Sequence, residues 1–353
     1  MKKRKNVAAL SITVAAVLLF LSGACSRRRE IISGELLPSD EKIRQEGFYL
    51  LKTGADQSYA VQTDENTQLA SLAEGLTTAD LKSGKSLKLT AEGTKSRKRY
   101  KTGDAGDYPV FRADSLLIDG IYLHHALQLA DGTPVTKIQS VFTDGYSLDD
   151  GTVLLRENRE TVFANDETIG KFLKPEAAAA AKTYFQKRAP FYDLEAELNR
   201  AYSRYREAGD DERFEDYLLE ENLMIAAEAE DYLYFITEIA LPSEHDASEH
   251  QAFYSGTVIR KDDGSCAGPA ELFDFPEENF NESILSYFEI EEEAQADALT
   301  KALRPEYFIF YPERLELCFP PGSLPFSESS YSAAAEYEDG LASHMRAEAL
   351  PRD

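Results

Sequence analysis

The spacing of apolar residues changes character near Pro175. From Glu35 to Lys174 the apolar residues come in short stretches, most of four residues or fewer, separated by turn residues. These stretches are 48–51, 58–61, 86–89, 108–111, 116–118, 141–142, 153–155 and 161–163. Four Asp-Gly pairs lie between them, at 119–120, 131–132, 144–145 and 150–151, and such pairs suit tight hairpin turns. The pattern predicts a small, mostly antiparallel β domain over residues 35–174.

Beyond Pro175 the apolar spacing becomes helical. An alanine-rich helix is predicted over 176–188, and a second one begins behind Pro190. The second helix has one apolar stripe at intervals of three and four residues, made of Phe191, Leu194, Leu198, Tyr202 and Tyr205. A third helix is predicted over about 213–229. β-branched and aromatic residues then predict strands over 232–241 and 252–260, with a turn at 262–265.

The last part of the chain combines a helix with a hairpin. An acidic first turn after Pro276 opens a helix that continues to Leu303, with a break near Glu291. Two apolar runs, 307–311 and 315–319, predict a hairpin, and a terminal helix is expected over 331–345. We therefore predict an α+β domain over 175–353, with helices packed on an antiparallel sheet.

The N-terminus has the pattern of an export signal. Four basic residues precede the apolar run Val7–Leu21, and small residues lead to Cys25. A cysteine at this place resembles the lipobox of bacterial lipoproteins, although Ser22 stands where an aliphatic residue is commonest. An uncleaved anchor is less favoured, because the run would rise only about 22 Å as a helix and a hydrocarbon core is about 30 Å thick. We predict a lipoprotein signal peptide over 1–24, acylation of Cys25, and a basic tether over 25–34.

The charge of the chain restricts its partners. Residues 1–24 hold four basic and no acidic side chains, so their removal changes the formal net charge from −25 to −29. Such a surface repels nucleic acid and speeds encounters with basic proteins, although solubility is the better explanation of the charge taken by itself. Arg27, Arg28 and Arg29 are the exception, since they could lie on anionic lipid. A basic run over 95–101 is expected to be a solvated loop.

Candidate chemistry is sparse. The chain has three cysteines, and with Cys25 acylated only Cys266 and Cys318 could pair in an oxidising compartment. One cluster, Glu244-His245-Asp246 with Glu249-His250, could bind a divalent metal. Its flanking residues favour an exposed loop, and a spacing of five does not align two histidines on one helix face. One imidazole of His124-His125 is expected in the core.

No common catalytic motif occurs, and the chain has five histidines. We therefore expect neither enzymatic activity nor a cofactor. The competing hypothesis is a hydrolase or deacetylase that acts on the cell wall, or a non-catalytic wall module. A metal requirement would favour that class, whereas saturable binding to a basic protein without turnover would favour a receptor.

The C-terminal half resembles a known extracytoplasmic domain. The order of its elements looks like that of the domain found in RsiV-type anti-sigma factors and many Firmicutes surface proteins. These elements are a strand, the turn 261–264, a short 271–273 element, a long helix, and the runs 307–310 and 315–322. The resemblance covers roughly residues 175–341 and implies helices packed on an antiparallel sheet.

The resemblance also implies a function. In RsiV-type proteins the domain binds lysozyme outside the cell, while a separate cytoplasmic segment holds a sigma factor. Only Met1–Asn6 precede the apolar run here, so direct sigma-factor binding is not expected. The expectation is an extracytoplasmic, lipid-anchored binding or sensing protein for a basic protein such as lysozyme, or for a cell-wall ligand.

Overall fold

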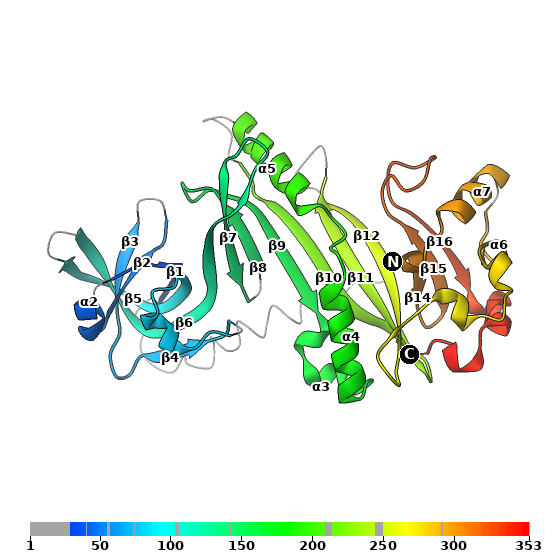
Figure 1. Ribbon diagram of the computed structural model, residues 1–353, viewed down its shortest axis with the longest axis horizontal. Helices are drawn as coiled ribbons and strands as arrows, with labels where there is room; N and C mark the ends of the chain where they lie inside the picture. The colour runs from blue at the N-terminus through cyan, green and yellow to red at the C-terminus, as the bar shows by residue number, and fades with distance from the viewer. Residues whose placement is uncertain are drawn as a thin grey trace. The chain divides into compact units, whose positions relative to one another are not determined.

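The computed structural model describes residues 29–352, except 40, 55–56, 74, 103–105, 142, 209–213, 244–249 and 291 (Figure 1). The predicted signal peptide and Cys25 lie outside the described residues. The chain divides into two compact units. The first ends at Ile118, and the second starts at Asp119 and includes residues 73–75. None of the described helices is both long enough and apolar enough to cross a bilayer.

The first unit is built almost entirely of strands. Its elements are β1 (Glu30–Leu36), α2 (Glu41–Gln45), β2 (Phe48–Lys52), β3 (Ser58–Gln62), β4 (Gln68–Ser71), the 3₁₀ helix η1 (Thr78–Lys82), β5 (Leu87–Thr102) and the first part of β6 (Gly106–Gln128).

The strands of this unit close into a ring. β1 pairs antiparallel with β2 and β5, β2 pairs with β3, β3 runs parallel to β6, and β6 pairs with β5. This order is that of a five-stranded Greek-key barrel of the OB type. Fully buried side chains such as Leu51, Leu87 and Phe111 fill its core. The parallel pair was not predicted, because apolar spacing does not show which strands become neighbours.

The second unit contains one long sheet with helices and a smaller sheet packed on it. Its strands are the end of β6, β7 (Pro134–Ser140), β8 (Thr143–Ser147), β9 (Val153–Thr161), β10 (Tyr217–Glu228), β11 (Tyr232–Pro242), β12 (His250–Arg260) and β13 (Cys266–Ala267), in that spatial order. Only β9 and β10 pair parallel among these strands. The helices are α3 (Asp166–Ile169), α4 (Pro175–Lys187), α5 (Leu194–Ala208), α6 (Phe280–Leu285) and α7 (Glu293–Ala302).

Two layers cover this sheet on opposite faces (Figure 1). On one face, α5 packs on β9 and β10 through Leu198 and Ala201, and α4 packs further along through Ala177 and Ala181. On the other face lies a three-stranded sheet of β14 (Phe308–Phe310), β15 (Arg314–Phe319) and β16 (Tyr331–Glu336). Ile309 of β14 and Cys318 of β15 contact Ile236 of β11, while α6 and α7 cover the far side.

Most predicted elements of the C-terminal half are confirmed. α4 starts at Pro175 and α5 follows Pro190; β11, β12 and the β14–β15 hairpin lie where expected. The helix predicted to break near Glu291 consists of α6 and α7. The division of the chain lies after Ile118 instead of near Pro175. The reason is that β9 pairs with β10, so residues 134–161 belong to the same sheet as the strands after the helices.

Several local predictions were wrong. The expected helix over 213–229 is β10, because Tyr217, Leu219 and Leu223 bury one face of a strand between β9 and β11. The expected terminal helix contains β16, which pairs with β15.

Two of the four Asp-Gly pairs are turns, where Gly132 and Gly151 have positive φ angles of 87° and 88°. The other two pairs lie inside β6 and β8. The basic run over 95–101 is exposed as expected, but it belongs to β5 and is not a loop.

Gly256 sets how closely the small sheet packs on the large one. A Cβ at Gly256 would lie 1.7 Å from the backbone oxygen of Phe308, so any side chain must push β14 away. Gly256→Ala is therefore expected to lower the free energy of unfolding by about 3 kcal/mol or more, as measured by urea denaturation. Gly145→Ala is the matched control. It lies in β8 of the same sheet, its nearest neighbour would be 3.6 Å away, and a change within about 1 kcal/mol is expected. Equal losses in both variants would contradict this account.

Candidate functional site

Most candidate site residues from the sequence cannot be placed. Cys25, Glu244, His245, Asp246, Glu249 and the side chain of His250 lie outside the described residues. Within the described part of the chain, no group of three or more His, Cys, Asp or Glu side chains is arranged to hold a metal ion.

Cys266 and Cys318 are both free thiols in the structure. Cys266 lies exposed on β13, and Cys318 lies buried on β15 beside Glu316. Burial raises the pKa of the Cys318 thiol, and the Glu316 carboxylate raises it further. Cys318 is therefore a neutral core residue at physiological pH.

The pair His124-His125 is not in the core. Both side chains are exposed, at a register shift between β6 and β7. His125 has a φ of 52°, in the left-handed region that a non-glycine residue rarely adopts, and its Nε2 lies 3.4 Å from Asp149. The prediction that one of these imidazoles lies in the core was wrong, because the irregular pairing at this point turns both rings outward.

A polar band crosses the helix-covered face of the second unit's sheet. Cross-strand partners place its members on that face, one or two from each strand from β7 to β12. They are Lys137, Asp144, Glu157, Arg159, Glu221, Thr237 and Ser255. The band separates the apolar cluster under α5 from the one under α3 and α4. The segment 188–193, which joins α4 to α5, adds Arg188, which pairs with Glu221, and Tyr192, which donates to Glu157.

Glu157 is the most buried charged group of the band, with 5% of its surface exposed. Its Oε2 accepts a hydrogen bond of 2.9 Å from the Tyr146 hydroxyl, and its Oε1 accepts one each from Tyr192 and Arg159. Arg159 Nε and Nη2 also lie 3.4 and 3.3 Å from the Tyr192 hydroxyl. Three donors from two strands and the α4–α5 segment therefore converge on one carboxylate.

These contacts keep Glu157 ionised. Burial raises its pKa, but the hydrogen bonds from Tyr192 and Tyr146 and the charge of Arg159 lower it by more, so the pKa lies below the usual value. Burial, and then the hydrogen bond to Glu157, raise the pKa of Tyr192. A carboxyl group held in this way cannot act as a general acid near neutral pH.

Arg188 closes the other end of the band. Its Nη2 lies 2.7 Å from Glu221 Oε1 and 3.2 Å from Thr237 Oγ1, and its guanidinium lies 4.4 Å from the centre of the Phe191 ring. Its side chain is 17% exposed. Arg188 thereby pairs a partly buried carboxylate and fixes the end of α4 on the sheet.

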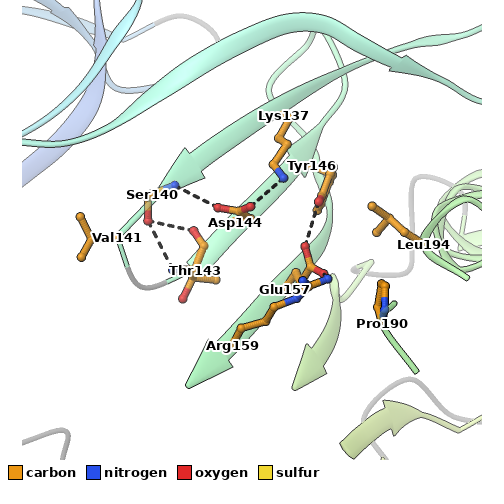
Figure 2. A pocket seen from close by; sticks show the side chains of 10 residues that line it. All are labelled: Lys137, Ser140, Val141, Thr143, Asp144, Tyr146, Glu157, Arg159, Pro190 and Leu194. Carbon is orange, nitrogen blue, oxygen red and sulfur yellow. Dashed lines mark hydrogen bonds and ion pairs between the residues drawn. The ribbon is translucent and has the colours of Figure 1, made fainter. Parts of the chain in front are cut away.

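A pocket of about 250 Å³ opens at the β7–β9 end of the band (Figure 2). Lys137, Asp144, Tyr146, Glu157 and Arg159 form one wall. Pro190, from the α4–α5 segment, and Leu194, the first residue of α5, lie across from Val141. Lys137 Nζ is 2.7 Å from Asp144 Oδ2 and 5.5 Å from the centre of the Tyr146 ring. The backbone N–H of Ser140 donates to Asp144 Oδ1 over 3.1 Å. The pocket combines charged groups in fixed positions with an apolar wall.

On the opposite face of the sheet, acidic and aromatic residues of β10–β12 lie beside residues of the β14–β15 hairpin. We call this the Glu238 surface; it comprises Glu220, Met224, Glu238 and Tyr254 of the large sheet and Tyr311 and Glu316 of the hairpin. Glu238 is the cross-strand partner of Tyr254, whose hydroxyl donates to Glu238 Oε1 over 3.4 Å. Burial and then Glu316 raise the pKa of Tyr311 to about 12, and the charge of Tyr254 also contributes. Met224 is 44% exposed.

The first unit has a larger and more polar groove of about 570 Å³. Arg29 lies in it, 3.5 Å from both Glu92 and Asp114. No aromatic side chain is among its lining residues, which are Arg29, Gln62, Asp64, Asn66, Thr67, Gln68, Glu92, Thr94, Arg112, Ala113, Asp114 and Ser115. The groove therefore offers hydrogen bonds but no ring on which a ligand could stack.

The sequence analysis did not identify Glu157, Arg159 or Glu238. The sequence did contain a signal for Glu157 and Arg159. Both share one face of a strand with the apolar residue Leu155. A charged residue that continues a buried apolar face, as Glu157 does, indicates a buried charge that must be compensated. No signal linked them to Tyr192, which is 35 residues away from Glu157 along the chain.

Glu157→Gln is expected to destabilise the second unit by about 2 kcal/mol, because it leaves Arg159 without its buried carboxylate. Urea denaturation at pH 7 measures the loss. Glu160→Gln is the matched control on the same strand, since Glu160 is exposed, and its effect should stay within about 0.5 kcal/mol. The account fails if both variants lose the same stability.

The stability difference between wild type and Glu157→Gln should depend on pH. Because the folded-state pKa of Glu157 is lowered, its ionised form stabilises the fold in full above the unfolded value of about 4.3. That contribution is lost as the pH falls through the folded-state pKa. Denaturation curves from pH 7 downward should therefore converge for the two proteins in acid. A constant difference at every pH would argue against an ionised Glu157.

Comparisons with known proteins give distant similarities. No protein-family model matches this chain, and no curated protein matches it. Solved structures of two DUF3298 family proteins are similar to it. The one from Pseudomonas aeruginosa PAO1 is 11% identical, with a TM-score of 0.30 over 56% of this chain and 88% of that chain. The one from Bacteroides fragilis NCTC 9343 is 10% identical, with a TM-score of 0.29 over 64% of this chain and 92% of that chain. Similarities at this level assign no function to the chain.

Proposed function

We propose that this chain is a lipid-anchored, extracytoplasmic binding protein without enzymatic activity, which captures a cationic protein on the Glu238 surface. The observation that carries the proposal is the combination of carboxylates and aromatic rings on neighbouring parts of the large sheet and the β14–β15 hairpin. Aromatic anchors supply most of the energy of protein interfaces, and rim charges mainly speed association.

The geometry of the Glu238 surface suits a basic partner. Glu316 pairs with Arg314, whereas Glu220 and Glu238 form no ion pair with a described residue. The carboxylates of Glu220 and Glu238 are therefore the ones available to a ligand's cations. Tyr254 and Tyr311 are partly buried, which fixes their rings before a partner arrives. A preformed surface loses less conformational entropy on binding.

The net negative charge of the whole chain also favours binding of a cationic partner. The predicted mature chain carries −29, and such a field attracts cationic proteins over distances that depend on salt. The resemblance to RsiV-type domains makes lysozyme the first partner to test. The basic-apolar-small residue order before Cys25 supports export and acylation of this cysteine.

The test is calorimetric titration of residues 26–353 with lysozyme at two salt concentrations. Saturable binding with defined stoichiometry that persists at the higher salt is expected. A binding signal that disappears at the higher salt concentration would indicate only non-specific electrostatic association of an acidic protein with a basic one. The absence of binding at both salt concentrations would exclude lysozyme as the partner.

Variants locate the site. Tyr254→Ala is expected to weaken binding at least tenfold, because it removes an aromatic anchor. Glu238→Gln should mainly slow association and reduce the salt dependence. Tyr184→Ala is the control, since Tyr184 lies 37% exposed on α4 and contributes to the helix layer on the opposite face of the sheet. If Tyr184→Ala weakens binding as much as Tyr254→Ala, the Glu238 surface is not the site.

A further inference from the structure

The pocket at the β7–β9 end of the polar band contains N–H donors that no described residue uses, on Lys137 and Arg159. Each carboxylate oxygen of Asp144 and Glu157 already accepts at least one hydrogen bond. Lys137 has three N–H donors, and its one ion pair among the described residues is with Asp144. Arg159 uses Nε and Nη2 for Tyr192 and Glu157, so both N–H groups of Nη1 remain free of described partners.

The free donors are accessible. The Arg159 side chain is 50% exposed and the Lys137 side chain is 27% exposed, and both line the pocket. The two cations offset the two carboxylates, so the formal charge of these four side chains sums to zero. Glu157 and Asp144 hold the two cations in place, which prepares their free N–H groups for a ligand.

The pocket also has an apolar side and a small volume. Pro190 of the α4–α5 segment and Leu194 at the start of α5 face the charged wall (Figure 2). Its volume of about 250 Å³ is below the range of about 300–1,000 Å³ in which most ligand pockets fall. It therefore suits a small molecule or the terminal residue of a longer chain.

We propose that this pocket binds a small aliphatic carboxylate, with the carboxylate between Lys137 and Arg159 and the aliphatic part against Pro190 and Leu194. A free amino acid derivative and a peptide C-terminus share this chemistry. The site is separate from the Glu238 surface, which lies on the opposite face of the sheet.

Calorimetric titration of the full chain with N-acetyl-leucine tests the proposal, and N-acetyl-leucinamide is the matched control ligand. The acid is expected to bind saturably at one site, and the neutral amide at least tenfold more weakly, because it lacks the carboxylate. Equal affinity of acid and amide, or no binding of the acid, would overturn the proposal. A peptide ending in leucine, tested as acid and as amide, distinguishes a peptide C-terminus from a free amino acid derivative.

Variants identify the two cations. Lys137→Met and Arg159→Lys are each expected to weaken binding of N-acetyl-leucine at least fivefold, whereas Lys182→Met should not change it. Lys182 is exposed on α4 and does not line the pocket, so it controls for a general loss of positive charge. Arg159→Lys keeps the charge beside Glu157, and thermal unfolding verifies that each variant is folded. Unchanged affinity of both pocket variants for N-acetyl-leucine would show that the ligand does not bind in this pocket.

Discussion

The buried carboxylate of Glu157 is the constraint on which the second unit depends. A charge that is 5% exposed must be compensated, and the three donors that compensate it come from β8, β9 and the segment before α5. Tyr192 therefore ties the segment before α5 to the sheet, and Asp193, whose Oδ1 accepts from the N–H groups of Glu195 and Ala196, caps the helix that follows. Pro190 of this segment and Leu194, the first residue of α5, form one wall of the pocket. One hydrogen-bonded charge thus connects the sheet, the helix layer and the cavity.

The two faces of this sheet have different roles. On one face, helices cover two apolar clusters, and the polar band between them holds its charges in fixed pairs. On the other face, the β14–β16 sheet covers only part of the surface, since its close approach is centred on Gly256. Beyond that contact, Glu238 and Tyr254 remain accessible on neighbouring strands. Incomplete coverage by the second layer is what leaves a surface for a partner.

Local sequence patterns predicted those elements whose signal is contained within a few residues. Pro175 and Pro190 marked the two helices, and the β-branched and aromatic runs marked β11 and β12. β10 was assigned to a helix because Phe214, Tyr217, Leu218, Met224 and Ile225 also fit a helical spacing. Neighbouring strands on both sides decided its conformation, and their presence is not encoded in the segment itself.

The sequence by itself determined the strand-rich first part, the helices and hairpin of the second, and the acidic charge of the chain. Only the tertiary structure decided the division after Ile118, the ring formed by β1, β2, β3, β6 and β5, and the meeting of Glu157 with Tyr192. The physical reason is that periodicity reports which face of an element is buried, but not which distant element buries it. Pairing across long separations depends on the packing of whole layers. Residues that act together are therefore recognised only once the chain is folded.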